Sequence, residues 1–264
     1  MIGIYRALLL AQLQSAAQYR VQFVLWMLFS IVRPIIFLAA WVAVTAAQGG
    51  TVAGFTAADF AAYYIALTLV MHLTTAWNSF EFEFEVRQGR LSPKLLRPLH
   101  PLHYSVVENL VFKLTTLPPL AVVLVIIGLT FQVRFATQPW HLALFIPSIA
   151  LAAALSFMVG WVVATLAFWV QRVQTANTLL QRTSFMLAGQ IAPISLMPLP
   201  LQVAAYALPF AYILAVPTDI LRGGLTLEAA LVQMAGQGAW LAASFVAFTV
   251  VWRAGLRQYS GVGA

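Results

Sequence analysis

Long apolar stretches separated by short polar segments make up most of the 264-residue chain. Each is near the roughly twenty residues that a helix needs to cross a bilayer, and none alternates like the strands of a membrane barrel. A chain in lipid must satisfy its own backbone polar groups, which helices do. The pattern therefore predicts an all-α polytopic membrane protein, a single transmembrane domain over residues 1–264, with six transmembrane helices at about 22–46, 58–79, 105–131, 142–170, 176–197 and 228–252.

Composition agrees with this class. Hydrophobic residues make up 62% of the chain and charged residues 8%, whereas about a quarter of a soluble domain is charged. The chain has no cysteine, which excludes disulfides, thiolate metal sites and cysteine nucleophiles. The net charge of +7 first indicates loops held at the cytoplasmic side, and nucleic acid is not an expected partner.

The distribution of lysine and arginine predicts the orientation. With the N-terminus inside, eleven basic residues lie on or near the cytoplasmic side, two (Arg134 and Arg222) lie outside, and Arg33 falls within the first span. Both termini should therefore be cytoplasmic. The eleven are Arg6, Arg20, Arg87, Arg90, Lys94, Arg97, Lys113, Arg172, Arg182, Arg253 and Arg257.

Residues 1–21 are too polar to span a membrane and carry no convincing cleavage site, so we interpret them as retained. Gln12, Ser15, Gln18 and Tyr19 recur at helical spacing, which predicts a helix lying in the cytoplasmic interface. An ordinary cytoplasmic extension of the first span is the alternative.

Polar chemistry is concentrated in residues 81–104, between the second and third spans. The alternating "FEFEFEV" is predicted to be helical, with Glu83 and Arg87 paired at i,i+4 and Gly89 ending the helix. Ser92 before Pro93 then predicts a new helix, capped by the serine hydroxyl.

That second helix is short, with apolar Leu95 and Leu96 flanked by Lys94 and Arg97. Such a segment, projecting from two membrane helices, is typical of an element that docks into another protein. The alternative is a charged loop that only satisfies the positive-inside rule, although that rule does not require the acidic residues found here.

Polar residues inside predicted spans mark a candidate substrate pathway, because such groups should face protein or a water-filled cavity. The fifth span is the most polar. For Arg33, a snorkelling arginine is an alternative, and His72 could simply be a hydrogen-bonded bundle residue. The pathway candidates are Arg33, His72, Gln181, Thr183, Ser184 and Gln190.

Two further patterns concern packing. Residues 198–224 hold four prolines between apolar pieces too short to cross, which predicts an external re-entrant segment, with a long headgroup-bound loop as the alternative. The fourth span carries one small residue every four positions, which suits packing within the subunit or a subunit interface. These are Ser148, Ala152, Ser156, Gly160 and Ala164.

The sequence lacks the common motifs of nucleotide-binding and catalytic sites. There is no Walker-type phosphate loop, no HExxH, no GxSxG and no paired intramembrane carboxylates. We therefore expect no catalytic residue and no metal site in this chain, and any ATP hydrolysis should occur in another subunit.

The stretch "EVRQGRLSPKLLRPLHPLHY" and the six-span plan resemble the membrane subunits of type-2 ATP-binding-cassette (ABC) transporters. The resembling subgroup carries an E-[IV]-R-x-G-x-L-x-x-x-L-L-R-P-L-x-P-L pattern. Here it falls on Glu85, Val86, Arg87, Gly89, Leu91, Leu95, Leu96, Arg97, Pro98, Leu99, Pro101 and Leu102.

The resemblance implies an export permease of the bacterial cytoplasmic (inner) membrane, working with a second permease, identical or a sister protein. ABC ATPase subunits would bind ATP and Mg. Residues 81–104 would hold the coupling helix that docks on the ATPase, through Glu85, Arg87, Arg90, Leu91, Lys94, Leu95, Leu96 and Arg97. Membrane lipids surround the chain, and a pathway of Gln, Thr, Ser and aromatic residues suits an amphipathic small-molecule or lipid-like substrate.

Two other classes of function stay open. A polytopic membrane enzyme acting on lipids would need a cluster of ionisable residues at one membrane face, for which His100 and His103 are the nearest candidates. An ion-coupled carrier would need a buried acid within a span, yet the acids outside residues 81–104 fall at span ends: Asp59, Glu108, Asp219 and Glu228.

Overall fold

A computed structural model describes residues 2–133, 135, 137–170 and 172–259. Within these residues every regular element is a helix, as the apolar pattern predicts. They are α1 Ile2–Gln18, α2 Arg20–Ala47, α3 Ala57–Thr74, α4 Asn78–Arg87, α5 Leu91–Leu95, α6 Leu102–Thr130, α7 Pro139–Ala164, η1 Thr165–Phe168, α8 Gln174–Leu187, η2 Ile194–Leu196, α9 Leu199–Tyr206, α10 Pro209–Ile213, α11 Ala215–Leu221 and α12 Leu227–Gln258.

Five helical segments of the described chain are long and apolar enough to cross a membrane. They are Val24–Ala47, Ala57–Arg87, Leu102–Thr130, Pro139–Phe168 and Leu227–Gln258. The predicted fifth span, 176–197, is wrong as one crossing helix. The segment forms α8 and, after a break, the three-residue η2. The 14 residues of α8 extend about 21 Å at 1.5 Å per residue, short of a hydrocarbon core of about 30 Å.

The chain leaves helical geometry after α8 because aromatic side chains satisfy its free carbonyl groups. Tyr63 donates to the carbonyl oxygen of Gly189 at 2.6 Å, and Tyr64 and Trp41 donate to that of Ile191 at 2.6 and 2.8 Å. Gly189 has φ +81°, which favours glycine. Irregular backbone at this depth is thus shielded by α2 and α3, as a membrane interior requires.

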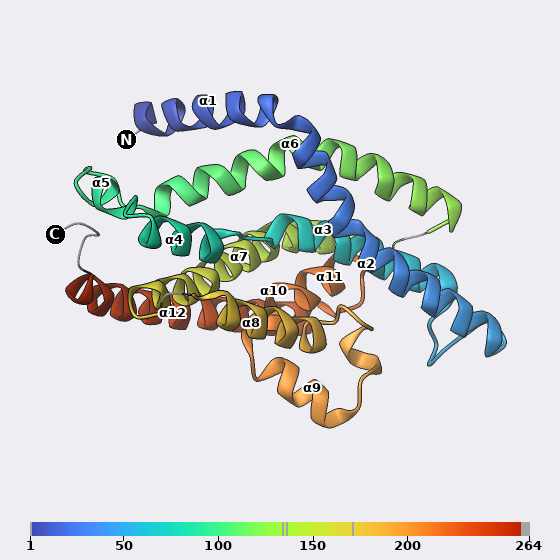
Figure 1. Cartoon of the computed structure of the whole chain (residues 1–264). Coiled ribbons are helices and arrows are strands. Elements are labelled where there is room, and N and C mark those ends of the chain that lie inside the picture. The colour runs from blue at the N-terminus through green and yellow to red at the C-terminus, as the bar shows by residue number, and fades with distance from the viewer. Residues whose placement is uncertain (1, 134, 136, 171, 260–264) are drawn as a thin grey trace.

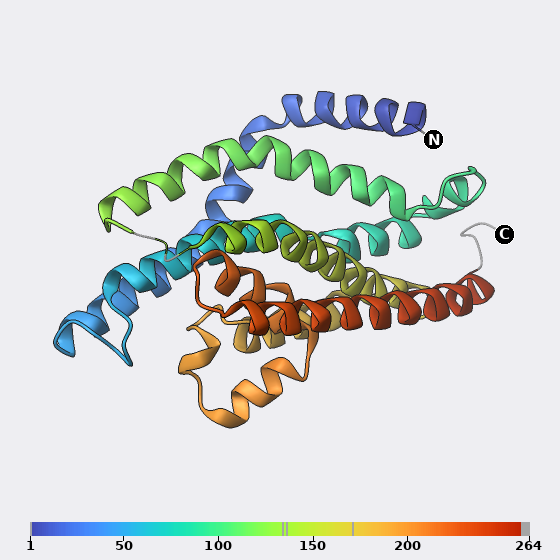
Figure 2. The ribbon, with the colours of Figure 1, turned by 180° about the vertical axis from the view of Figure 1, so that it is seen from behind.

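The helices run along one long direction (Figure 1). α7 packs most extensively on α12, and Gln237 at the centre of that contact is completely buried. Its amide donates to the carbonyl oxygens of Tyr212 at 2.8 Å and Ser148 at 3.2 Å. Figure 2 shows α12 along the length of the molecule, with α1 and α6 at one edge and α9 at the other.

The small residues of α7 pack inside the chain. Ser148 donates to Gln237 Oε1 at 3.1 Å, and a Cβ at Gly160 would come within 2.5 Å of the Asn78 side chain. Ser156 lines a cavity, while Ala152 and Ala164 are buried. Of the two interpretations of this stripe, the structure supports packing within the subunit.

Of the helix predicted over residues 1–21, α1 forms Ile2–Gln18, and it lies against the first half of α6. Ala16 packs with Val107 and Val111, and the Tyr5 hydroxyl hydrogen-bonds His103 Nδ1. The start of α1, α5 and the end of α12 lie at the same end of the molecule (Figure 1). The position of α1 in a membrane interface stays a prediction.

Residues 198–224 form three short helices, of which α9 and the α10–α11 pair are bent by 73° relative to each other. Asp219 and Arg222 form an ion pair of 2.7 Å, and the guanidinium lies over the rings of Phe55 and Tyr63. Asp219 is buried, so it is more enclosed than its position near a span end suggests. Re-entry of this segment into the membrane stays a prediction.

Candidate functional site

The polar segment between the second and third spans forms two consecutive helices, α4 and α5. The expected pair of α4 is present, with Arg87 Nη1 3.7 Å from Glu83 Oε1. The other carboxylate oxygen of Glu83 accepts a 2.9 Å hydrogen bond from the backbone N–H of Val173. Glu83 therefore holds α4 against the chain that follows η1.

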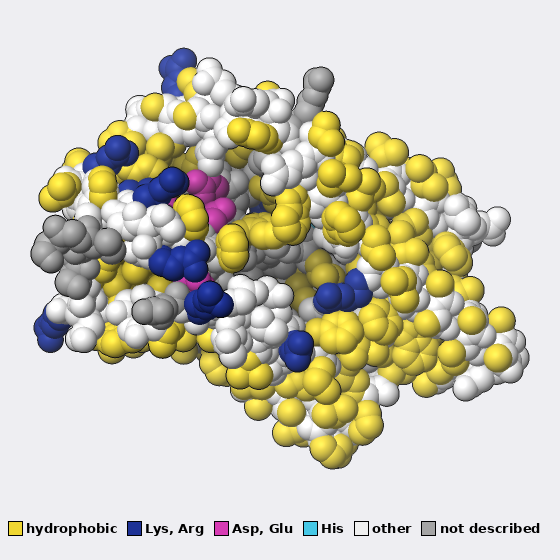
Figure 3. Space-filling view, viewed as in Figure 1, with side chains coloured by type: hydrophobic (Ala, Val, Ile, Leu, Met, Phe, Trp, Pro, Cys, Tyr) yellow, Lys and Arg dark blue, Asp and Glu magenta, His cyan; other side chains and the backbone are white. Residues whose placement is uncertain are grey.

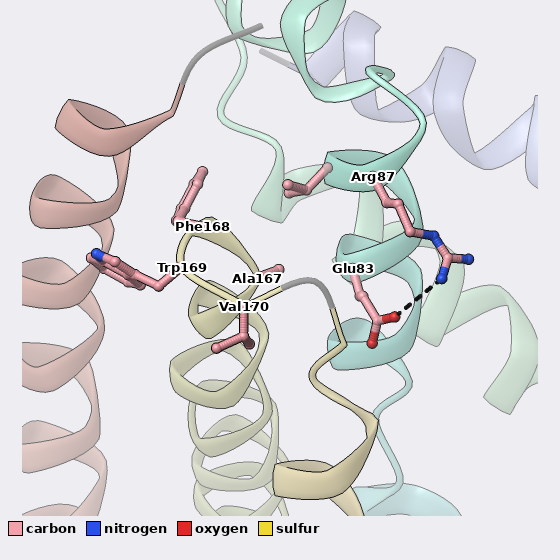
Figure 4. Close-up of a pocket in the computed structure, with 7 residues that line it drawn as sticks. Glu83, Arg87, Ala167, Phe168, Trp169 and Val170 are labelled. Atoms are coloured by element: carbon pink, nitrogen blue, oxygen red, sulfur yellow. Dashed lines mark ion pairs between the residues drawn. The ribbon is translucent and has the colours of Figure 1, made fainter. Parts of the chain in front are cut away.

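A small cavity of about 180 Å³ lies beside this contact. Figure 4 shows Glu83 and Arg87 on α4, joined by their ion pair, beside the turn that carries Ala167, Phe168 and Val170, and all five residues line the cavity. Its walls are mostly apolar apart from the ion pair. The cavity is thus a gap between α4 and the segment after η1.

The turn between α4 and α5 is set by Gly89, which has φ +70° and ends α4 as predicted. Lys94 on α5 returns to α4 and forms an ion pair with Glu85. Its ammonium also lies 4.7 Å from the centre of the Tyr104 ring on α6. The short α5 is therefore anchored to both helices that carry it.

The predicted helix cap at Ser92 is wrong. α5 starts two residues earlier than predicted, at Leu91, and Arg90 is the N-cap residue without a side-chain capping bond. The Ser92 hydroxyl instead hydrogen-bonds the Tyr259 hydroxyl at 2.8 Å. A tertiary partner at the end of α12 has replaced the local cap.

The residues predicted to dock differ in exposure. Leu96, at the end of α5, is 89% exposed, the highest value among the exposed large hydrophobic side chains. Arg87, Arg90 and Arg97 are also exposed, while Glu85, Lys94 and Leu95 are partly covered. Leu91 is completely buried, which corrects its place in the predicted docking surface.

Beneath α5 lies an aromatic cluster made of Phe82, Trp161, Phe168, Phe248 and Trp252, which joins α4, α7, η1 and α12. Phe82 lies 5.0 Å from Trp161, 5.5 Å from Phe168 and 5.7 Å from Trp252, between ring centres. Leu91 and Leu95 pack into the same cluster. Packing in this cluster therefore connects α5 with α4, α7 and α12.

The two histidines of this segment have separate environments. His100 lies 4.5 Å from the Trp252 ring, and burial, followed by nearby His103, lowers the pKa of His100. His103 bonds Tyr5 on α1. The described residues contain no group of three or more His, Cys, Asp or Glu side chains that could hold a metal ion.

A larger cavity of about 450 Å³, here called the central cavity, lies among α2, α3, α7, α8 and α10. It brings together five predicted pathway residues from four separate segments: Arg33, His72, Gln181, Ser184 and Gln190. Thr183 does not line it, and its hydroxyl donates to the carbonyl oxygen of Leu179. Whether substrate uses this cavity stays a prediction.

Five aromatic residues of the cavity wall are absent from the predicted pathway: Trp26, Phe29, Trp77, Phe112 and Phe210. Trp26 on α2 meets Trp77 edge to face, with 5.1 Å between ring centres. In the sequence, these residues look like ordinary apolar positions. α3 ends at Thr74, with Thr75 as its C-cap, shortly before Trp77. In the sequence, this pair of threonines is a local sign that the helix is interrupted there.

Charged and hydrophobic side chains occupy different parts of the surface. Figure 3 shows lysine and arginine gathered around the end that carries α4 and α5, while hydrophobic side chains cover much of the remainder of this face. That division suits a protein surrounded by lipid, with one charged end in water.

A search of curated proteins finds no significant match. A family comparison does match, over residues 25–263, with the family described as ABC-2 family transporter protein. The matched residues include those that line the central cavity and those of the α4–α5 segment. The chain therefore belongs to the ABC-2 transporter family, as a multi-pass permease component of an ABC transporter.

Proposed function

We propose that this chain is the permease of an ATP-driven exporter, which forms the substrate pathway as a dimer with an identical or sister permease. ATP and Mg bind to separate ATPase subunits. Both termini and the α4–α5 segment face the cytoplasm of a bacterial cell, because basic residues are concentrated at that end.

The observation that carries this proposal is Leu96, an 89% exposed leucine on a short, braced helix. α5 is held by the Lys94–Glu85 ion pair and by the Ser92–Tyr259 hydrogen bond. A large apolar side chain on a rigid, basic tip suits a pocket on a partner protein, since buried apolar anchors dominate interface energies. We assign this tip, with Arg97, as the contact to the ATPase.

Coupling then follows from the packing beneath α5. When the ATPase subunits close on ATP, they push α5, and the aromatic cluster carries the displacement to α4, α7 and α12. α4 continues the α3 segment, which lines the central cavity. ATP-driven motion at α5 thereby changes access to the cavity, which we propose as the pathway for an amphipathic small-molecule or lipid-like substrate.

The test substitutes Leu96 and measures ATP hydrolysis by the co-purified ATPase in lipid nanodiscs. Leu96→Asp should abolish substrate-stimulated hydrolysis, because a charge replaces the apolar anchor, and the permease should remain folded since Leu96 makes few internal contacts. Arg257→Glu, a change at an exposed position of α12 at the same end of the molecule, is the control. Unaltered stimulation in Leu96→Asp would overturn the docking assignment.

A further inference from the structure

The central cavity has an unbalanced charge. Among the described residues that line it, Arg33 is a fixed cation and none is an aspartate or glutamate. Arg33 lies near the middle of α2, and its guanidinium contacts the Phe185 ring at 5.0 Å. None of the described acidic side chains forms an ion pair with it.

Such an arrangement suits an anionic ligand. An arginine does not lose its proton in proteins, so Arg33 stays charged. A charge near the centre of a membrane helix costs at least about 2.5 kcal/mol unless it is compensated. A guanidinium binds carboxylate or phosphate oxygens through paired hydrogen bonds, which makes an oxyanion the matching ligand.

The rest of the wall adds polar and apolar contacts. The Trp77 Nε1–H donor and the Gln190 Oε1 acceptor are buried without a hydrogen-bond partner within the described chain. Leaving such atoms unsatisfied costs about 1–3 kcal/mol each. Trp26, Phe29 and Leu180 supply apolar surface in the same cavity.

We infer that the central cavity binds an amphipathic anion, with its phosphate or carboxylate group on Arg33 and its apolar part against the aromatic wall. This inference rests on the proposed function, because it names the class of substrate that the permease carries.

The experiment measures direct binding to the purified full-length chain in nanodiscs of zwitterionic lipid. Radiolabelled dodecyl phosphate is the probe, and unlabelled dodecyl phosphate, dodecyl trimethylammonium and inorganic phosphate are the competitors. We expect competition from dodecyl phosphate alone. Arg33→Gln should weaken probe binding about ten- to a hundredfold, the loss of a hydrogen bond to a charged group, and Arg33→Lys should retain part of it.

Arg257→Gln removes the same charge from an exposed position at the end of α12 and should leave probe binding unchanged. Equal competition by the cationic amphiphile, or by inorganic phosphate, would overturn the inference. So would unchanged probe binding in Arg33→Gln. Loss of the permease dimer in Arg33→Gln, without a change in headgroup selectivity, would assign Arg33 to the dimer contact and overturn the inference as well.

Failure of this inference is distinguishable from failure of the proposed function. The binding measurement contains no ATPase, whereas the Leu96 experiment measures coupling to one. Headgroup-independent binding, together with loss of stimulated hydrolysis in Leu96→Asp, would remove only the substrate class. Selective anion binding, together with unaltered stimulated hydrolysis in Leu96→Asp, would remove only the docking assignment.

Discussion

The Tyr63 hydroxyl on α3 donates a 2.6 Å hydrogen bond to the carbonyl oxygen of Gly189, where α8 has ended and the chain turns back. The residues are 126 positions apart in the sequence. Tyr63 thus satisfies the Gly189 carbonyl group, to which lipid could not donate a hydrogen bond. The same hydroxyl fills the space in which a Cβ at Gly189 would lie.

Gly189→Ala should destabilise the protein. The ideal Cβ would lie 2.5 Å from the Tyr63 hydroxyl, and φ is +81°, so we expect a cost of about 1–3 kcal/mol from strain at this backbone conformation. Thermal unfolding in detergent measures it. Gly238→Ala is the matched control, because nothing lies within 4 Å of its Cβ and alanine favours the α12 helix. A similar melting temperature for both variants would contradict the prediction.

Tyr63→Phe should also lower stability, by about 1–3 kcal/mol, because the Gly189 carbonyl group loses its donor in a buried site. Unfolding temperature is again the measurement. Tyr19→Phe removes an equivalent hydroxyl from a position that is 53% exposed and should have little effect. If both variants unfold at the wild-type temperature, the hydrogen bond does not stabilise the turn after α8.

Lys94→Glu should uncouple the ATPase by releasing α5 from α4, since two carboxylates would then face each other at positions 85 and 94. The double variant Glu85→Lys/Lys94→Glu restores opposite charges and should recover most of the stimulated hydrolysis. The measurement is ATP turnover of the co-purified complex with and without substrate. Equal loss in the single and double variants would show that the ion pair does not position α5.

Arg222→Gln should destabilise the segment after α8. Asp219 would remain buried without its 2.7 Å partner, and the contacts with the Phe55 and Tyr63 rings would be lost. We expect about 1.5–3 kcal/mol, the range for a hydrogen bond to a charged group. Asp219→Asn/Arg222→Gln should recover part of the loss, because it removes the unpaired charge. No recovery in the double variant, measured by thermal unfolding, would contradict this account.

Local patterns in the sequence were sufficient for the helical class and for most features of α4. Apolar runs near twenty residues predict membrane helices because lipid leaves no other way to satisfy the backbone. The Glu83–Arg87 pair and the end of α4 at Gly89 depend on neighbours within a few residues, and both are present. The Ser92 cap failed because Tyr259, far along the chain, offers its hydroxyl a partner.

What the sequence by itself determined is therefore the set of long apolar helices, the concentration of charge in residues 81–104, and the polar residues that must avoid lipid. The tertiary structure decided where α8 ends, because Trp41, Tyr63 and Tyr64 on other helices satisfy the carbonyl groups of the break. It also decided that polar residues from α2, α3 and α8 share one cavity. Such contacts depend on side chains brought together across long stretches of chain, which no local spacing encodes.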